Sequence, residues 1–283
     1  MKYLPGIILI LTAAVVLIIA AVSVVYTIMP AGDVKTDITL PSDLVYIKEN
    51  IEERIAVIED NTKKASEKIS IEDFKATDEA LLEAYLNSSY TLSYGFMSAD
   101  GVLMAVAPEE YADSAGLNIG SFEPAKTILS KREPYMTTAF TAIEGFYAIE
   151  LSCPVFSSDG EYKGAVLCMA EPYRLLGDII SPVENETGAS ITVMQTDGLI
   201  LYDRDIKQAG KNLFTDPFFT QYKSLINLGH TICSKKTGYG TYTFYESGAD
   251  SSKSVKKQAY WDTVENSGQE WRIILFKSEV MGI

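Results

Sequence analysis

The sequence has few of the residues on which most catalytic and metal sites depend. Its 283 residues include one histidine, His230, and three cysteines, Cys153, Cys168 and Cys233. The cysteines form no CxxC pair and no other metal-like spacing, and the HExxH and GxSxG motifs are absent. No partner motif near His230 supplies a nucleophile held against a base. We therefore expect no enzyme, no cofactor and no metal site, and an unrecognised hydrolase is the remaining catalytic alternative.

Basic residues are scarce relative to acidic ones. The chain has 24 lysines and arginines against 38 aspartates and glutamates, which gives a formal net charge of −14. Such a surface repels nucleic acid and anionic lipid, and it offers no basic cleft for phosphorylated substrates. We therefore expect no nucleic-acid partner. We interpret the acidity as an aid to solubility rather than as a cation site.

Two of the three cysteines flank a polar turn at residues 157–160. Cys153 and Cys168 fall on what look like two antiparallel strands, so their positions could be nearly opposite. In an oxidising compartment they could form a disulfide. Cysteine is also often buried, so the alternative is that both are small apolar residues of paired strands.

Charge is absent from residues 3–32. The apolar run at 6–29 would reach about 36 Å as a helix, enough to span a bilayer with some tilt. Lys2 precedes the run and Asp33 follows it, which predicts a cytoplasmic start and an extracytoplasmic remainder. We expect residues 1–32 to be an uncleaved, single-pass membrane anchor. A cleaved signal peptide is the alternative, although its apolar core is normally about 7–15 residues.

A long amphipathic helix is predicted within residues 33–70, which otherwise form a linker. Apolar residues recur at three- and four-residue steps from Leu44 to Ile69, and Ser42 or Asp43 can cap the helix start. The stripe keeps a period of about 3.5, so the helix could form a homodimeric coiled coil. Alternatively, it lies along the globular part that follows.

Two stretches of the chain resemble each other. Asp-Gly pairs at 100–101 and 197–198 each join apolar, β-branched runs, a pattern typical of tight turns between antiparallel strands. Each pair is followed by an Ala-Gly-x-Asn sequence, at 115–118 and at 209–212. Landmarks repeated in the same order predict a duplicated unit. We place the two units at residues 71–180 and 181–283.

The hydrophobic period predicts helices placed between the second and third strands of each unit, and hence two α+β domains with antiparallel sheets. Residues 214–228 are expected to be helical, with Pro217 in the first turn. The expected strands lie near 93–98, 102–107, 146–156, 163–170, 189–196, 199–203, 239–246, 256–264 and 270–276.

Motifs between residues 42 and 278 resemble those of the double Cache family, the tandem PAS-like extracellular sensor modules of prokaryotic receptors. The run Arg132-Glu-Pro-Tyr-Met-Thr-Thr looks like a family loop, and Pro154-Val155 with Gly160 looks like a family hairpin. Gly210-Lys-Asn and Trp271-Arg-Ile look like the corresponding second-module motifs. The resemblance implies a membrane-tethered small-molecule sensor outside the cytoplasm.

The resemblance also implies where the ligand lies. The first, membrane-distal module of such receptors usually holds the ligand, between its sheet and the loop-helix segment that crosses the sheet. A concave apolar wall with a few polar groups suits a small molecule. The corresponding residues here are Tyr94 and Phe96 on the first strand, Arg132, Tyr135 and Thr137 on the loop, and Tyr147 or Glu150 on the third strand.

Each candidate has a simpler interpretation. The aromatic residues Tyr94, Phe96 and Tyr147 could be plain core residues. Glu150 alternates with apolar neighbours, which favours a side chain that faces water. Arg132 could grip a ligand carboxylate with two parallel hydrogen bonds, or it could be an exposed surface arginine.

Two features depart from the family. Amino-acid-binding members carry an Arg-x-Trp-Tyr-like run and a later aspartate for the amine, whereas here Pro134 replaces the tryptophan and Met169 stands at the aspartate position. An α-amino acid is therefore disfavoured, and a small carboxylate or an uncharged metabolite is expected. The chain also ends soon after its last strand, so we expect it to signal through a separate protein. The alternative is a structural or interaction module of the cell envelope that binds no ligand.

Overall fold

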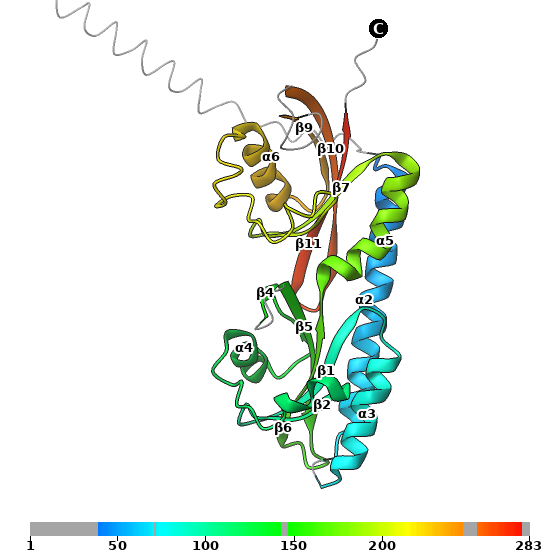
Figure 1. Cartoon of the computed structure of the whole chain (residues 1–283), viewed down its shortest axis with the longest axis vertical. Coiled ribbons are helices and arrows are strands. Elements are labelled where there is room, and N and C mark those ends of the chain that lie inside the picture. The colour runs from blue at the N-terminus through cyan, green and yellow to red at the C-terminus, as the bar shows by residue number, and fades with distance from the viewer. Residues whose placement is uncertain (1–38, 71, 143–146, 246–253, 279–283) are drawn as a thin grey trace, which may run out of the picture. The chain divides into compact units, whose positions relative to one another are not determined.

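The structure is a computed structural model that describes residues 39–70, 72–142, 147–245 and 254–278 (Figure 1). Contacts divide the chain at Leu40, and the description below concerns the unit that begins there. Within the described ranges no helix is both long and apolar enough to cross a bilayer. The predicted anchor at 1–32 lies outside those ranges.

Helix α2, Ser42–Lys68, carries the apolar stripe that the sequence predicts. Ile51 and Ile58 on this stripe are 0% and 1% exposed. The helix contacts strand β5 (Tyr147–Phe156) and strand β10 (Ser254–Asn266), so the stripe is buried within the chain. Burial of each such side chain contributes about 1.5–3 kcal/mol. Of the two expectations, the helix therefore lies along the globular part, and this stripe is not available for a coiled-coil dimer.

The first sheet is antiparallel, with strand order β2-β1-β6-β5-β3, and β4 also pairs with β5. One face packs on α2 and α3, and the other packs on α4 through Ala125 and Ile128 (Figure 1). The further elements of this part are α3 (Phe74–Leu86), β1 (Thr91–Ser98), β2 (Leu103–Ala107), the 3-10 helix η1 (Glu109–Ser114), α4 (Glu123–Lys131), β3 (Tyr135–Met136), β4 (Phe140–Thr141) and β6 (Tyr162–Ala170).

The second sheet repeats this plan with strand order β8-β7-β11-β10-β9. Helices α2 and α5 pack on one face, and α6 packs on the other through Leu228 and Ile232. Its further elements are α5 (Pro172–Thr187), β7 (Ser190–Gln195), β8 (Ile200–Asp203), α6 (Lys223–Ser234), β9 (Gly238–Tyr245) and β11 (Gln269–Ser278).

The two halves have the same strand connections. In each sheet the hairpin β1–β2 or β7–β8 is joined at one edge to the last strand of its unit. The repeated Ala-Gly-x-Asn sequences also take equivalent places, because isolated bridges join Val102 to Asn118 and Leu199 to Asn212. The prediction of an α+β fold with two antiparallel sheets is therefore confirmed.

The predicted helix at 214–228 is wrong in its boundaries, because α6 begins only at Lys223. The Asn212 side chain accepts hydrogen bonds from the backbone amides of Phe214 and Thr215, and Asp216 accepts one from Phe218. Such local side-chain bonds offer the backbone an alternative to helix. Helix α5, which has Pro182 inside it, was not predicted as a whole.

The cysteines of the first sheet are free and buried. Cys153 lies opposite Val166, and Cys168 lies opposite Leu151, so the two are not paired across β5 and β6. They therefore fill core positions on the strands, which is the second of the two interpretations of the sequence.

Candidate ligand-binding site

The two faces of the first sheet divide the predicted ligand residues between them. Tyr94 and Phe96 of β1 are 0% and 4% exposed and belong to the core under α2. The Tyr94 hydroxyl forms a 2.7 Å hydrogen bond with Ser88 Oγ, and burial raises the pKa of Tyr94 well above its ordinary value. These two aromatic residues therefore lie on the helix face of the sheet, as core residues.

Glu150 lies on the opposite face of the first sheet. It is the cross-strand partner of Met169, which in turn lies opposite Ser93, and this face is the one that α4 covers. The Glu150 side chain is only 7% exposed, so the expectation that it faces water is wrong. Alternation along a strand implies exposure only when one face of the sheet is open, and here both faces are covered.

The buried Glu150 carboxyl has no partner among the residues that the structure describes. Its backbone is fixed by Thr137, whose Oγ1 accepts from the Glu150 amide at 3.0 Å and whose own amide donates to the Glu150 carbonyl at 2.9 Å. No described residue donates a hydrogen bond to the carboxylate or forms an ion pair with it. Burial raises the pKa of Glu150 to about 7. A buried carboxyl in this state gains free energy from any donor or cation that reaches it.

Thr137 is the predicted loop residue that the structure brings to Glu150. Tyr135 lies next on the edge strand, where its carbonyl accepts from Ser152 Oγ at 3.0 Å and its hydroxyl accepts from Gln269 Nε2 at 3.3 Å. Ser152 and Glu150 share the α4 face. Tyr135 thus connects this face to the β10–β11 hairpin of the second sheet.

The remaining two candidates point elsewhere. Tyr147 is 39% exposed, and its ring lies against Gly210 of the second unit, where an added Cβ would stand 2.3 Å from the ring. Arg132 is exposed at the end of α4, with its guanidinium carbon 4.8 Å from the centre of the Tyr162 ring. The structure therefore groups Thr137 and Glu150, with Tyr135 beside them, and separates the other four candidates from that group.

In the family resemblance, the aspartate that holds a ligand amine corresponds to Met169, so this chain has no acid at that position. The structure places Glu150 directly across the strand pair from Met169, on the same face. A carboxylate is therefore present at this place, but it comes from the neighbouring strand. Strand register, which a single sequence specifies weakly, was the missing information.

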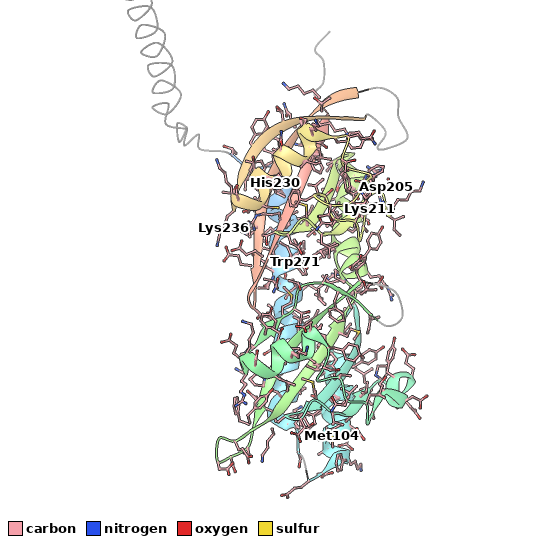
Figure 2. The ribbon with its side chains drawn as sticks, turned by 90° about the vertical axis from the view of Figure 1, so that its left-hand side faces the viewer. Met104, Asp205, Lys211, His230, Lys236 and Trp271 are labelled. Atoms are coloured by element: carbon pink, nitrogen blue, oxygen red, sulfur yellow. The ribbon has the colours of Figure 1, made fainter. Side chains whose placement is uncertain are left out.

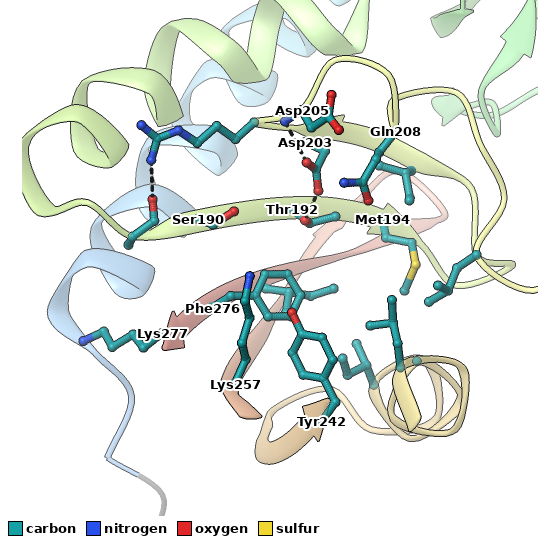
Figure 3. Close-up of a pocket in the computed structure, with 18 of the residues that line it drawn as sticks. Ser190, Thr192, Met194, Asp203, Asp205, Gln208, Tyr242, Lys257, Phe276 and Lys277 are labelled. Carbon is teal, nitrogen blue, oxygen red and sulfur yellow. Dashed lines mark hydrogen bonds between the residues drawn. The ribbon is translucent and has the colours of Figure 1, made fainter. Parts of the chain in front are cut away.

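A cavity of about 890 Å³ opens on the α6 face of the second sheet (Figure 3). Other cavities lined by described residues measure about 440, 270 and 60 Å³. Sheet, α6 and the segment between β8 and α6 all contribute side chains. Its apolar lining includes Met194, Ile200, Leu213, Phe219, Ile232 and Phe276, and its polar lining includes Ser190, Thr192, Asp203, Asp205 and Gln208.

Asp203 is the buried acid of this cavity. It is 7% exposed, and its two carboxylate oxygens accept from Thr192 Oγ1 at 2.5 Å and from the Asp205 amide at 2.8 Å (Figure 3). Burial raises its pKa to about 6, although these two hydrogen bonds oppose the shift. The sequence interpretation missed this residue. Its position on the strand after the second Asp-Gly pair was the available signal.

No catalytic arrangement is evident among the described residues. His230 is exposed on α6 (Figure 2). Its ring stacks on that of Phe214, with ring centres 4.1 Å apart. Within the described ranges no group of three or more histidine, cysteine, aspartate or glutamate side chains could hold a metal ion.

Comparisons with known proteins agree with this architecture. Residues 54–172 match the family described as HK/GC/Chemotaxis protein-like, sensor domain. No curated protein matches the sequence. The chain thus carries a sensor-domain sequence over most of the first sheet and its helices.

Solved structures share the fold over most of the described chain. An extracellular ligand binding receptor from Desulfohalobium retbaense has a TM-score of 0.69 at 23% identity, covering 83% of this chain and 39% of that chain, so this chain spans less than half of it. The ligand-binding domain of the Pseudomonas aeruginosa amino acid chemoreceptor PctB, in complex with L-Arg, has a TM-score of 0.60 at 16% identity, with 84% and 85% covered. The periplasmic sensory domain of the Campylobacter jejuni chemoreceptor Tlp1 has a TM-score of 0.57 at 14% identity, with 84% and 91% covered.

The resemblance to tandem Cache sensor modules is therefore confirmed at the level of fold, and residues 54–172 match a sensor-domain family. These similar structures are described as an extracellular ligand binding receptor, a chemoreceptor ligand-binding domain and a periplasmic sensory domain.

Proposed function

We propose that this chain is an extracytoplasmic small-molecule sensor, held at the cell membrane by residues 1–32, whose ligand binds on the α4 face of the first sheet. The two units would divide near residue 180. The observation that carries the proposal is the Glu150 carboxyl, which is 7% exposed and meets no partner among the described residues. An unpaired buried carboxyl weakens folding, so its presence on the face where the family resemblance implies a ligand suggests a binding role.

The chemistry of Glu150 narrows the ligand class. A ligand that presents an ammonium group or a neutral hydrogen-bond donor would pair with this carboxylate, whereas a carboxylate placed there would be repelled. Similar structures hold ligands with an amine: PctB with L-Arg, PctC with GABA and Mlp24 with asparagine. A small amine-bearing metabolite is therefore the preferred class, with an uncharged donor as the alternative.

The loop that frames this face also provides a route for a signal. The Met136 amide donates to the Ser267 carbonyl at 2.9 Å, and the Ala139 amide donates to Gln195 Oε1 at 2.7 Å. Both acceptors belong to the second sheet. A ligand that repositions Thr137 would therefore shift these contacts and favour one of two packings of the sheets against α2.

The test is a binding screen with the full purified chain, using the twenty common L-amino acids, γ-aminobutyrate and short primary amines as probes. A ligand at about 100 times its dissociation constant adds about 2.7 kcal/mol to the free energy of unfolding, which a thermal shift detects. The Glu150→Gln variant should lose binding at least tenfold, because the neutral amide cannot pair with an ammonium group.

Tyr94→Phe serves as the matched control, because Tyr94 lies on the helix face and its loss should leave affinity unchanged. The comparison is made in the Asp203→Asn background, so that the cavity of the second sheet does not contribute. Binding that survives Glu150→Gln in that background would reject this site. A chain that binds none of the probes would favour the envelope-module alternative. The anchor is tested separately: in intact cells the chain should sediment with membranes and be cleaved by added protease.

A further inference from the structure

The second sheet carries a cavity that lies apart from the ligand site proposed on the first sheet. At about 890 Å³ it falls in the range typical of small-molecule sites, about 300–1,000 Å³. Residues of β7, β8, β9, β10 and β11 line it on the sheet side, and residues of α6 line it on the other. Figure 3 shows Ser190 and Thr192 on β7, with Asp203, Asp205 and Gln208 on β8 and the segment after it. Tyr242, Phe276, Lys257 and Lys277 come from the other strands of the sheet.

We propose that this cavity is a second ligand-binding site, which takes a small molecule with an apolar body and one ammonium group, the ammonium lying against Asp203. The proposal is independent of the first-sheet site, because none of the residues that carry it contacts Glu150 or Thr137 in the described structure.

The apolar end of the cavity selects the body of the ligand. Met194, Ile200 and Leu213 line it from the sheet and the following loop, and each is at most 5% exposed. Tyr242 and Phe276 meet edge to face with ring centres 5.3 Å apart and close one side. An alkyl or aryl group that displaces water from such a surface gains about 25 cal/mol for each Å² it buries.

The polar end selects the ammonium. Both oxygens of Asp203 accept from neutral donors, Thr192 Oγ1 and the Asp205 amide, and each oxygen can accept one bond more. No described residue forms an ion pair with Asp203. The Asp205 carboxylate next to it adds negative potential. A buried carboxylate beside a second one attracts a cation and repels an anion.

Four basic side chains line the cavity: three lie at its rim, and Lys257 of β10 is half-buried. Arg204, Lys207 and Lys277 are all exposed, and the Arg204 guanidinium donates to the Ala189 carbonyl at 3.4 Å. A carboxylate on the ligand could therefore be tolerated at the mouth but not at Asp203. The amide of Gln208, which also lines the cavity, offers a neutral donor and acceptor between the two ends.

The experiment is calorimetric titration of the full purified chain with n-hexylamine, hexan-1-ol, hexanoate and norleucine. The titrations are repeated in Glu150→Gln, so that any binding of an amine at the first sheet is removed. We expect hexylamine and norleucine to bind at least tenfold more tightly than hexanol and hexanoate, in both chains. Equal affinity for hexylamine and hexanol would overturn the assignment of the ammonium, and so would an absence of hexylamine binding at millimolar concentration.

Two variants locate the site. Asp203→Asn should weaken hexylamine at least tenfold, while Glu265→Gln, which removes an exposed carboxylate of β10, should change nothing. Leu225→Trp should fill the cavity from α6 and weaken all four probes, and circular dichroism confirms that it folds. If folded Leu225→Trp or Asp203→Asn keeps wild-type affinity for hexylamine, the cavity is not the site. Loss of hexylamine binding in Glu150→Gln would assign it to the first sheet and also overturn the proposal.

Discussion

The two sheets have the same strand order, yet they differ in how closely a helix packs on the face opposite α2. In the first sheet, Ala125 and Ile128 of α4 pack onto Met97 and Leu167. In the second sheet, a cavity of about 890 Å³ remains between the strands and α6. Each sheet buries one acid on that face: Glu150 has no partner among the described residues, and Asp203 accepts two hydrogen bonds. The two copies thus share a topology and differ in the side chains that cover this face.

The largest expected change in stability comes from helix α2, which packs on both sheets. Ile51→Ala should lower the free energy of unfolding by about 2–5 kcal/mol, because Ile51 is fully buried and truncation leaves a cavity. Val57→Ala, at a position 48% exposed on the same helix, should change it by less than about 0.5 kcal/mol. Urea unfolding measures both values. Equal effects would contradict a helix packed along the sheets.

The next prediction distinguishes Glu150 from Asp203 by the pH range over which each changes the free energy of unfolding. A carboxyl whose pKa is raised by folding contributes stability that is complete below its unfolded pKa and is lost as pH rises to the folded value. For Glu150 the window runs from 4.5 to about 7, and for Asp203 from 3.8 to about 6. At about 1.4 kcal/mol per pKa unit, the stability lost is at most about 3.5 kcal/mol for Glu150 and about 3 kcal/mol for Asp203.

Urea unfolding at successive pH values should therefore show stability falling from pH 4 to pH 7. In Glu150→Gln the fall should end near pH 6, whereas in Asp203→Asn it should continue to pH 7. If both variants follow the wild-type curve, the two carboxyls are not buried as described.

A smaller effect compares the equivalent glycines of the two repeats. Gly116 and Gly210 both have positive φ, +89° and +81°, but an added Cβ meets nothing within 4 Å at Gly116 and meets the Tyr147 ring at 2.3 Å at Gly210. Gly116→Ala should cost about 1 kcal/mol from backbone strain alone. Gly210→Ala should cost more, and part of the excess should disappear in a double variant with Tyr147→Ala. Thermal unfolding of the four chains measures this coupling, and additive costs would reject the contact.

The sequence predicted the repeat, the sheets and the long helix because these depend on period and turn chemistry, which are local. The position of Lys223 at the start of α6 depended on side-chain bonds from Asn212 and Asp216 that compete with helix, and the pattern does not reveal which wins.

The candidate site was predicted less well, for a physical reason. Assigning Tyr94 and Glu150 to opposite faces requires the strand register and the knowledge that both faces are covered. The cavity beside Asp203 depends on how α6 packs, which is a tertiary property. Thr137 and Glu150 were both predicted as site residues, but only the structure reveals that they lie together and exchange backbone and side-chain hydrogen bonds.

The most direct measurement is the pKa of Glu150 itself, followed by carboxyl ¹³C NMR in the free chain and with the tightest amine-bearing probe from the screen. The account predicts a value of about 7 in the free chain. With the ligand bound it should fall below the ordinary glutamate value, because an ammonium beside the carboxylate favours its charged form. A free-chain value near the ordinary one, or a raised value that ligand binding leaves unchanged, would contradict it.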